Sequence, residues 1–187
     1  MLLREQATFP LAMRLREAPG VPIGEVYSFL SGLYFRGKLA YARAWARPAG
    51  AVRVIVPGRG LVTPDLPVTH ADMLEIAGVP VDVEDARYRE PLTSDADELA
   101  RTHPQAAAIL LGSIATGKYV DILAHSFGPR LRVPLEFVGR GDMSRGGLML
   151  RYVDEGRELT YAAVESVPRR GPRPPKLVPR PRPRANA

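Results

Sequence analysis

The sequence alternates between segments with helical periodicity and segments with strand character, and this order limits the folds open to the chain. Residues 25–45 place apolar side chains at three- and four-residue spacing, which predicts a helix broken near Gly32. Residues 52–56 and 106–111 are apolar runs of the kind found in buried strands. Strands that alternate with helices favour a mainly parallel sheet between two helical layers.

Shorter patterns complete this prediction. Thr69 precedes Asp72, and Ser94 precedes Asp97, at the spacing of a helix capping box. We therefore expect helices at 71–77 and 94–102, a further helix at 117–127, a strand at 131–138, a loop at 139–147, and a hairpin formed by 148–153 and 159–164. The expected fold is a three-layer α/β domain that has a mainly parallel sheet, a C-terminal antiparallel hairpin and a disordered basic tail.

The basic charge of the chain is concentrated at its C-terminal end. The net charge is +6, but residues 168–187 hold seven of the 26 basic residues, seven of the 19 prolines and none of the 20 acidic residues. Residues 1–167 are thus nearly neutral, and we expect them to form the domain. The 168–187 segment cannot bury enough apolar surface to offset its ordering entropy, so it is expected to be an extended, flexible tail.

Three functions of this tail remain open. Spaced guanidinium groups can pair with successive phosphates of a nucleic acid. The same composition also suits a solubilising end that makes no specific contact. A Pro-rich segment can instead dock into the aromatic groove of a protein partner.

The composition excludes several classes of site. The chain of 187 residues has no cysteine, which rules out disulfides, thiol nucleophiles and cysteine-bound zinc. His70, His103 and His125 lack the spacing of a metal motif, so no metal site is expected, and no motif identifies a cofactor. No apolar run is long enough to cross a membrane and the N-terminus has no secretory signal, so we expect a cytoplasmic protein without a membrane partner.

The segment after the 106–111 strand resembles a phosphate-binding loop. Residues 112–118 satisfy the pattern G-x-x-x-x-G-K, but Tyr119 follows where that loop needs Ser or Thr to hold magnesium. Ser113, Thr116 and Lys118 are therefore candidates for an anion or nucleotide pocket that uses no metal. The alternative is a plain helix start, in which the glycines serve packing and Lys118 is solvated.

Two other loops carry candidate residues. In 56–65, Arg59 is suited to bind a phosphate or carboxylate, and Asp65 to accept a proton, although Pro64-Asp65 is also ordinary turn chemistry. In 139–147, four glycines, Arg140, Arg145 and Asp142 suggest a flexible polar lip that closes on an anionic substrate. The alternative is a glycine-rich connector in which Asp142 pairs with one of the two arginines.

The first predicted helix also groups polar residues. Tyr34, Arg36, Lys38 and Tyr41 lie close together in the sequence and can present charge to the ligand end of the sheet. In the alternative interpretation they form a polar edge whose aliphatic stems cover core aromatics.

Three stretches carry a resemblance to known proteins: Tyr34-Phe35-Arg36-Gly37-Lys38-Leu39-Ala40-Tyr41-Ala42, the passage from Gly60-Leu61 to Pro64-Asp65, and Gly117-Lys118-Tyr119. Together they span about residues 28–150 and resemble a family of small bacterial α/β domains of unknown function. The resemblance implies an intracellular α/β fold with links to nucleic-acid or modified-base metabolism. Related domains carry an N-terminal strand with Ser-Cys-type residues and a Lys-rich turn, both absent here, so no catalytic residue is transferred.

The sequence favours a protein that handles nucleotides or nucleic acid. If it is an enzyme, which the sequence leaves open, hydrolysis or transfer at a phosphate or glycosidic bond is expected, with Asp65 or Asp142 as the base. Lys118 and Arg145 would then stabilise anionic charge. The alternative is a non-enzymatic adaptor that binds a protein partner through its Pro/Arg-rich tail. The first hypothesis requires the glycine-bearing loops to meet at one rim of the sheet.

Overall fold

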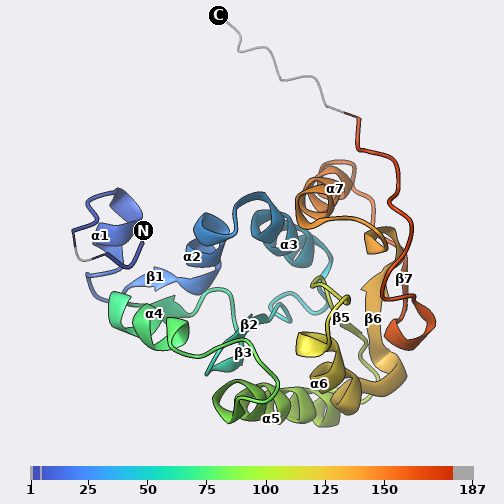
Figure 1. The fold of residues 1–187 in the computed structure, drawn as a ribbon, viewed down its shortest axis with the longest axis horizontal. Coiled ribbons are helices and arrows are strands. Elements are labelled where there is room, and N and C mark those ends of the chain that lie inside the picture. Colours follow the sequence, from blue (N-terminus) through green and yellow to red (C-terminus); the bar gives the residue numbers. More distant parts are fainter. Residues whose placement is uncertain (1, 5, 179–187) are drawn as a thin grey trace, which may run out of the picture.

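The computed structural model describes residues 2–4 and 6–178 and is dominated by helices (Figure 1). About 48% of the described residues are helical, and the strands form small sheets of two or three strands. The predicted three-layer domain with a mainly parallel sheet is therefore wrong. The strands are too short and too widely dispersed to form one continuous sheet, and most of the burial comes from packed helices.

The N-terminal part holds four elements: α1 (Pro10–Arg14), β1 (Val21–Pro22), α2 (Ile23–Leu30) and α3 (Gly32–Trp45). The predicted break near Gly32 is confirmed, because α2 ends before Ser31 and Gly32 has a φ of +55°. Glycine takes this left-handed conformation without steric cost, so the chain can change direction between the two helices.

A hairpin and a capped helix follow: β2 (Val54–Val56), β3 (Gly60–Val62), β4 (Pro67–Val68) and α4 (His70–Ala77). β2 pairs with β3 in antiparallel fashion, and β4 pairs with β1. The capping box of Thr69 and Asp72 is present and begins α4 as predicted.

The predicted helix at 94–102 begins earlier than expected. α5 (Ala86–Thr102) starts after Asp85, whose side chain accepts from the backbone N–H of Arg87. Ser94 therefore lies inside the helix, and Asp97 accepts a hydrogen bond from Ser126 in place of forming a cap. The neighbouring Asp95 accepts from the backbone N–H of Leu61 and ties α5 to β3.

One parallel strand pair remains from the predicted sheet. β5 (Ala108–Ile109) pairs with β6 (Leu131–Pro134), and α6 (Gly117–Phe127) is the crossover between them. The bounds of α6 agree with the prediction. A third strand, β7 (Tyr161–Ala163), pairs with β6 in antiparallel fashion, and short 3₁₀ turns lie at Gly128–Arg130, Leu135–Phe137 and Val164–Ser166.

The predicted C-terminal hairpin and the loop before it are wrong. Residues 148–153 belong to α7 (Asp142–Asp154), which also takes up most of the expected loop at 139–147. Arg145, Leu148 and Met149 are buried at helical spacing. Their apolar surfaces are covered by α3, and this packing outweighs the local preference of the glycines for irregular structure.

Three apolar clusters hold these elements together (Figure 1). One joins α1, α2 and α4 with the N-terminal strands, one joins α5 and α6 with β5 and β6, and one joins α3, α7 and β7. α3 lies centrally between the other elements. The face of α3 that looks toward β5 and α6 borders the candidate site.

Residues 168–178 form neither helix nor strand and lie along the domain. Arg169 donates to Asp121 in α6, Arg140 donates to the carbonyl of Pro175, and Leu177 packs on the α3–α7 cluster. Residues 179–187, to which the expectation of a flexible tail also extends, lie outside the described part of the chain. Among the described residues, no helix combines the length and apolar character needed to cross a membrane.

Candidate functional site

Lys38 is the most unusual charged residue of the structure. It lies on the inner face of α3, half-buried, and its Nζ atom is 3.9 Å from the centre of the Tyr34 ring. Burial lowers the pKa of Lys38 from 10.5 to about 8, while the charges of Asp142 and Arg145 act on it in opposite directions. Within the described residues, no carboxylate accepts a hydrogen bond from this ammonium. Lys38 is thus a desolvated cation that lacks a directly bonded counter-ion.

Arg145 adds a second cation from α7. Arg145 is 7% exposed, its Nε and Nη2 atoms donate to the carbonyl of Phe137, and its guanidinium lies over the Phe137 ring. Nη1 of Arg145 is 3.6 Å from the exposed carboxylate of Asp142, in the first turn of α7. These contacts hold the guanidinium in one orientation.

The loop between β5 and α6 covers the same region. Tyr34 donates to the carbonyl of Leu111 at 3.2 Å, which ties α3 to the end of β5. Burial, together with the charge of Asp142, raises the pKa of Tyr119 in the first turn of α6. We refer to Tyr34, Lys38, Tyr119, Asp142 and Arg145 as the Lys38 cluster. It combines two cations, one carboxylate and two phenols from three separate segments.

A cavity of about 670 Å³ lies beside this cluster, with Lys38 and Tyr119 in its wall. The wall is formed by α3, the β2–β3 hairpin, β5, β6 and α6. Seven of the chain's thirteen aromatic side chains line it: Tyr27, Phe35, Tyr41, Trp45, Tyr119, Phe127 and Tyr161. The indole Nε1 of Trp45 is buried and has no hydrogen-bond partner among the described residues.

A second part of the cavity wall, at Tyr41 and Tyr161, is also polar. The hydroxyls of Tyr41 and Tyr161 are 2.5 Å apart, and the Tyr41 oxygen accepts from the backbone N–H of Leu159. Arg132 and Glu158 lie in the wall nearby. The cavity wall therefore combines the ammonium of Lys38, seven aromatic side chains and a second polar group formed by the hydroxyls of Tyr41 and Tyr161.

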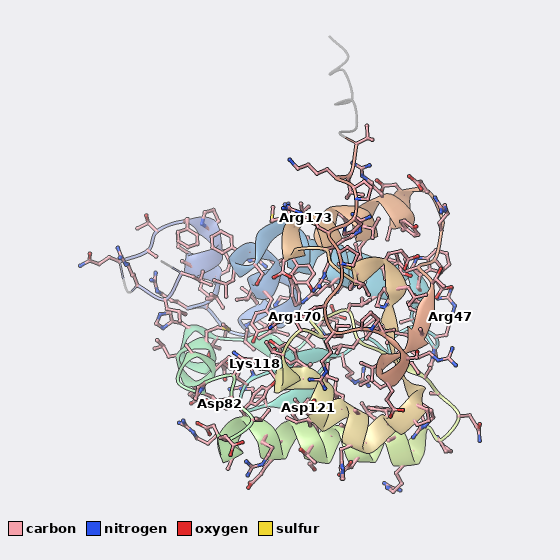
Figure 2. All side chains as sticks on the ribbon, turned by 45° about the vertical axis from the view of Figure 1, so that its right-hand side comes forward. Arg47, Asp82, Lys118, Asp121, Arg170 and Arg173 are labelled. Atoms are coloured by element: carbon pink, nitrogen blue, oxygen red, sulfur yellow. The ribbon has the colours of Figure 1, made fainter. Side chains whose placement is uncertain are left out.

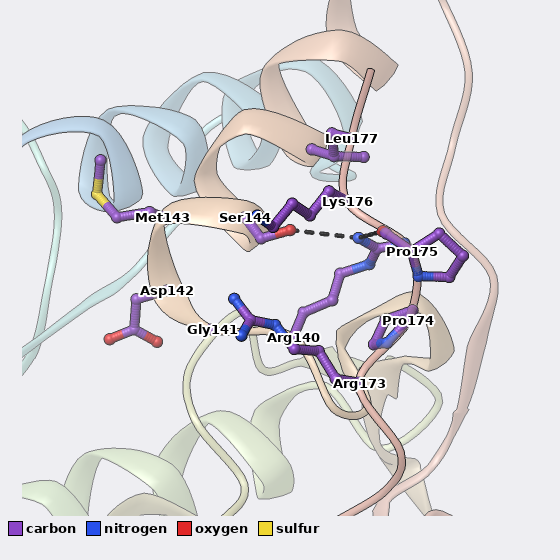
Figure 3. Close-up of a pocket in the computed structure, with 10 residues that line it drawn as sticks. All are labelled: Arg140, Gly141, Asp142, Met143, Ser144, Arg173, Pro174, Pro175, Lys176 and Leu177. Atoms are coloured by element: carbon purple, nitrogen blue, oxygen red, sulfur yellow. Dashed lines mark hydrogen bonds between the residues drawn. The ribbon is translucent and has the colours of Figure 1, made fainter. Parts of the chain in front are cut away.

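A second, more open pocket of about 740 Å³ lies between the start of α7 and residues 173–177 (Figure 3). Arg140 crosses it and donates to Ser144 Oγ and to the carbonyl of Pro175. Arg173 and Lys176 stand in its wall, and Asp142 lies at its edge. The lining carries three basic groups and one acidic group, which gives this surface a positive charge.

The structure does not bring Arg59 and Asp65 to either pocket. Arg59 donates to Asp72 at 2.5 Å and to Glu75, and so holds the start of α4. Asp65 is exposed and pairs with Arg43 at 2.6 Å. Neither of the two pockets is lined by Arg59, Lys118 or Arg145, so neither is the common pocket expected for these three residues.

The other predicted residues lie near the Lys38 cluster to different degrees. Asp142 and Arg145 belong to it, and Arg140 lines the neighbouring pocket. Ser113 is half-buried and accepts from the backbone N–H of Ala115, while Thr116 is exposed at the N-cap of α6 and Lys118 is exposed in the first turn of α6. Lys118 is exposed, as the alternative of a solvated lysine predicted, and it is labelled in Figure 2.

Sequence reasoning missed Trp45 and Tyr119 as site residues, and it named Lys38 only as one of four residues that can present charge to the ligand end of the sheet or form a polar edge. The available signal was their spacing, because Lys38, Tyr41 and Trp45 fall on one helical face. From spacing alone, a helical face with a lysine among apolar residues cannot be distinguished from a solvent-exposed polar edge. Only the non-local packing of the β2–β3 hairpin, β5, β6 and α6 turns this face into the side of a cavity.

Comparisons of the chain with protein-family models, with curated proteins and with solved structures found no match. The arrangement of side chains therefore carries the functional argument. In the described part of the chain, no group of three or more His, Asp or Glu side chains is placed to hold a metal ion.

The chemistry open to the Lys38 cluster follows from the pKa of its amine. At a pKa of about 8, Lys38 is mainly an ammonium at neutral pH, suited to bind an anion and to donate a proton. Roughly a tenth of it is the neutral amine at pH 7. The exposed carboxylate of Asp142 is the nearby group suited to accept a proton.

Proposed function

We propose that the protein handles nucleotides and binds their phosphate at the Lys38 cluster. The observation that carries this proposal is the desolvated ammonium of Lys38, which no carboxylate of the described residues contacts directly. A buried charge without a bonded counter-ion is costly to the fold. A bound phosphate would supply that counter-ion and recover part of the interaction energy.

Orientation supports the same proposal. The Tyr34 ring holds the Lys38 ammonium, and Phe137 fixes the Arg145 guanidinium, so little side-chain entropy would be lost on binding. If the ligand is also a substrate, Asp142 would accept a proton while Lys38 and Arg145 stabilise negative charge at a phosphate or glycosidic bond.

The proposal is tested by calorimetric titration of the wild-type protein with nucleoside 5′-monophosphates and with ribose 5-phosphate. Lys38→Met should weaken binding by about 10- to 100-fold, the range for one charge-assisted hydrogen bond. Lys118→Met is the matched control, because Lys118 is exposed, and it should change affinity by less than about twofold. Absence of binding by the wild type, or an equal loss in both variants, would refute the phosphate site at Lys38.

The adaptor function remains the second proposal, and one observation favours a charged surface for it. Arg170, Arg173 and Lys176 are exposed residues of the 168–178 segment, and Figure 2 labels Arg170 and Arg173. A partner of negative charge, nucleic acid or acidic protein, fits this surface better than an aromatic groove. Between these residues, the carbonyl of Pro175 accepts from Arg140, which ties the segment to the domain.

A further inference from the structure

We infer that the Lys38 cluster and the pocket at the start of α7 together bind the phosphorylated end of a single-stranded nucleic acid. In this arrangement the terminal phosphate lies at Lys38, and the backbone phosphates next to it lie along Arg140, Arg173 and Lys176. The inference rests on the proposed function for the phosphate and names the class of ligand that carries it. Three observations support it: the position of Asp142, the excess of positive charge, and the different burial of the two groups of cations.

The first observation is that Asp142 belongs to both sites. It lines the pocket at the start of α7, and its carboxylate is 3.6 Å from Nη1 of Arg145. Its charge also acts on the ammonium of Lys38. Asp142 and Arg145 are less than one helical turn apart, about 4.5 Å along the axis of α7. The two sites are therefore neighbours, and one ligand with several phosphates can engage both.

The second observation is the combined charge. The Lys38 cluster holds two cations and the pocket holds three, while Asp142 is the one carboxylate among the residues of the two sites. A terminal phosphate carries about −1.5 to −2 charges at pH 7, which balances the cluster alone. Arg140 is held by neutral partners, and the ion pairs of the described residues include neither Arg173 nor Lys176. The pocket thus has positive charge left for further phosphates.

The third observation separates the end of a strand from its backbone. Lys38 is half-buried and Arg145 is buried, and both are held in one orientation, which suits a single phosphate with two charges. Arg173 and Lys176 are instead exposed and spaced along the 168–178 segment, which suits successive singly charged phosphates. A nucleoside monophosphate would use the first group only. An acidic protein would fit the second group but offers no terminal phosphate to the first.

The shape of the pocket is compatible with a strand. It has a volume of about 740 Å³ and is bordered on one side by the start of α7 and on the other by residues 173–177 (Figure 3). Met143 lines it and is 65% exposed. A thioether makes favourable contacts with aromatic rings, so Met143 is suited to contact a base next to the bound phosphates.

The test compares three single-stranded oligonucleotides of one sequence, each about eight nucleotides long. One carries a 5′-phosphate, one a 3′-phosphate, and one no terminal phosphate. In calorimetric titrations of the wild-type protein, we expect one phosphorylated strand to bind about 10- to 100-fold more tightly than the unphosphorylated strand. The position of the preferred phosphate identifies the end of the strand that lies at Lys38.

Two variants assign the two parts of the ligand. Lys38→Met should remove the preference for the terminal phosphate and change the affinity for the unphosphorylated strand by less than about twofold. Arg173→Ala with Lys176→Ala should weaken all three strands and make the plot of log affinity against log salt less steep by roughly 1.4. The same double variant should leave the affinity for a nucleoside monophosphate within about twofold of the wild type. Arg36→Ala with Arg101→Ala removes equal charge outside the pocket and should keep the salt slope.

The outcomes separate the inference from the proposed function. Equal affinity for strands with and without a terminal phosphate would overturn the inference, and the phosphate site would stand if monophosphates still need Lys38. A preference for the terminal phosphate that persists in Lys38→Met would overturn both. An unchanged salt slope in the Arg173/Lys176 variant would remove the strand from the pocket. Binding of polyglutamate as tightly as the strands would show a general surface for polyanions and would also overturn the inference.

Discussion

The backbones of Gly37 in α3 and Gly146 in α7 are in contact where the two helices cross. A Cβ atom on Gly37 would lie 2.6 Å from the carbonyl oxygen of Gly146, and one on Gly146 would lie 2.7 Å from the carbonyl oxygen of Leu33. Such distances are shorter than any normal contact, so a methyl group on either residue would separate the helices. Because α3 carries Lys38 and α7 carries Arg145, this crossing also sets the geometry of the Lys38 cluster.

We predict that Gly146→Ala destabilises the protein although alanine favours helices. Alanine normally gains about 1 kcal/mol over glycine inside a helix. Here the added methyl group meets backbone atoms that cannot move independently, and overpacking of this kind costs about 1–3 kcal/mol. Urea unfolding should therefore show a net loss of stability, and phosphate binding should weaken as the two helices separate.

Gly147→Ala is the control for this prediction. Gly147 is the next residue of α7, and its added Cβ would meet only the Leu177 side chain at 3.5 Å, an ordinary contact. We expect unchanged or higher stability. A loss of stability in both variants would mean that helix geometry in general, and not the crossing with Gly37, is responsible.

Lys38→Met should stabilise the protein at neutral pH while it removes phosphate binding. The folded state lowers the pKa of Lys38 to about 8, so between about pH 8 and 10.5 the unfolded chain binds more protons than the folded one. The contribution of Lys38 to the free energy of unfolding is therefore most unfavourable below pH 8 and becomes less unfavourable as the pH rises to 10.5. Removing the charge should raise the free energy of unfolding at pH 7 by about 1 kcal/mol.

The measurement is urea unfolding of both proteins across this pH range. The gain of Lys38→Met over the wild type should shrink as the pH rises from 8 to 10.5, because the wild-type amine becomes neutral. Buried tyrosines such as Tyr27, whose pKa burial raises to about 12, lower stability at high pH in both proteins alike and cancel in the difference. A gain that is independent of pH would contradict the desolvation of Lys38.

Local signals in the sequence predicted the elements whose ends are set by nearby residues. Thr69 and Asp72 cap α4 through contacts three residues apart, and α6 ends at Gly128, which has a φ of +51°. Such ends need no information from the rest of the chain. These elements agree with the sequence prediction because capping and turn chemistry are local.

The errors arose where distant segments decide the outcome. Gly146 and Gly147 suggested a loop, but both lie in α7. Gly146 is needed there because α7 crosses α3 at Gly37, more than a hundred residues earlier, and the crossing leaves no room for a side chain. Arg59 suggested a ligand contact, but α4 provides two carboxylates for it. The Lys38 cluster was partly named through Asp142 and Arg145. Lys38 was named only as one of four polar residues with two open interpretations, and Trp45 was not named, because the cavity wall opposite them is formed by segments far along the chain.

Asp72→Asn should remove acid-dependent stability from the start of α4. Hydrogen bonds from Thr69, and then the Arg59 guanidinium, lower the pKa of Asp72 from 3.8 to about 2. The stabilisation by the Asp72 carboxylate is complete above about pH 4 and is lost as the pH falls through 2. The reason is that Asp72 takes up a proton at a higher pH in the unfolded chain than in the folded protein. At pH 7 the variant should lose about 1–2 kcal/mol, in line with other helix caps.

The loss in Asp72→Asn should narrow between pH 4 and pH 2 in acid unfolding followed by circular dichroism. Asp65→Asn provides the comparison, since its ion pair with Arg43 is solvent-exposed and contributes about 0–1 kcal/mol. A difference between wild type and Asp72→Asn that stays constant down to pH 2 would show that the carboxylate charge is not involved.

The basic residues of the 168–178 segment should dominate any binding to nucleic acid. Truncation after Val167 is a poor test, because it also removes Leu177 from the α3–α7 cluster and Arg169 from its contact with Asp121.

The double variant Arg170→Ala with Arg173→Ala removes two exposed charges and keeps those contacts. Its matched control is Arg36→Ala with Arg101→Ala, which removes the same charge from α3 and α5. We assume that Arg170 and Arg173 each pair with one phosphate of a single-stranded oligonucleotide. The plot of log affinity against log salt should then become less steep by roughly 1.4 in the Arg170/Arg173 variant only. Equal slopes in the two variants would leave net charge as the whole effect and remove the case for this segment as a polymer-binding surface.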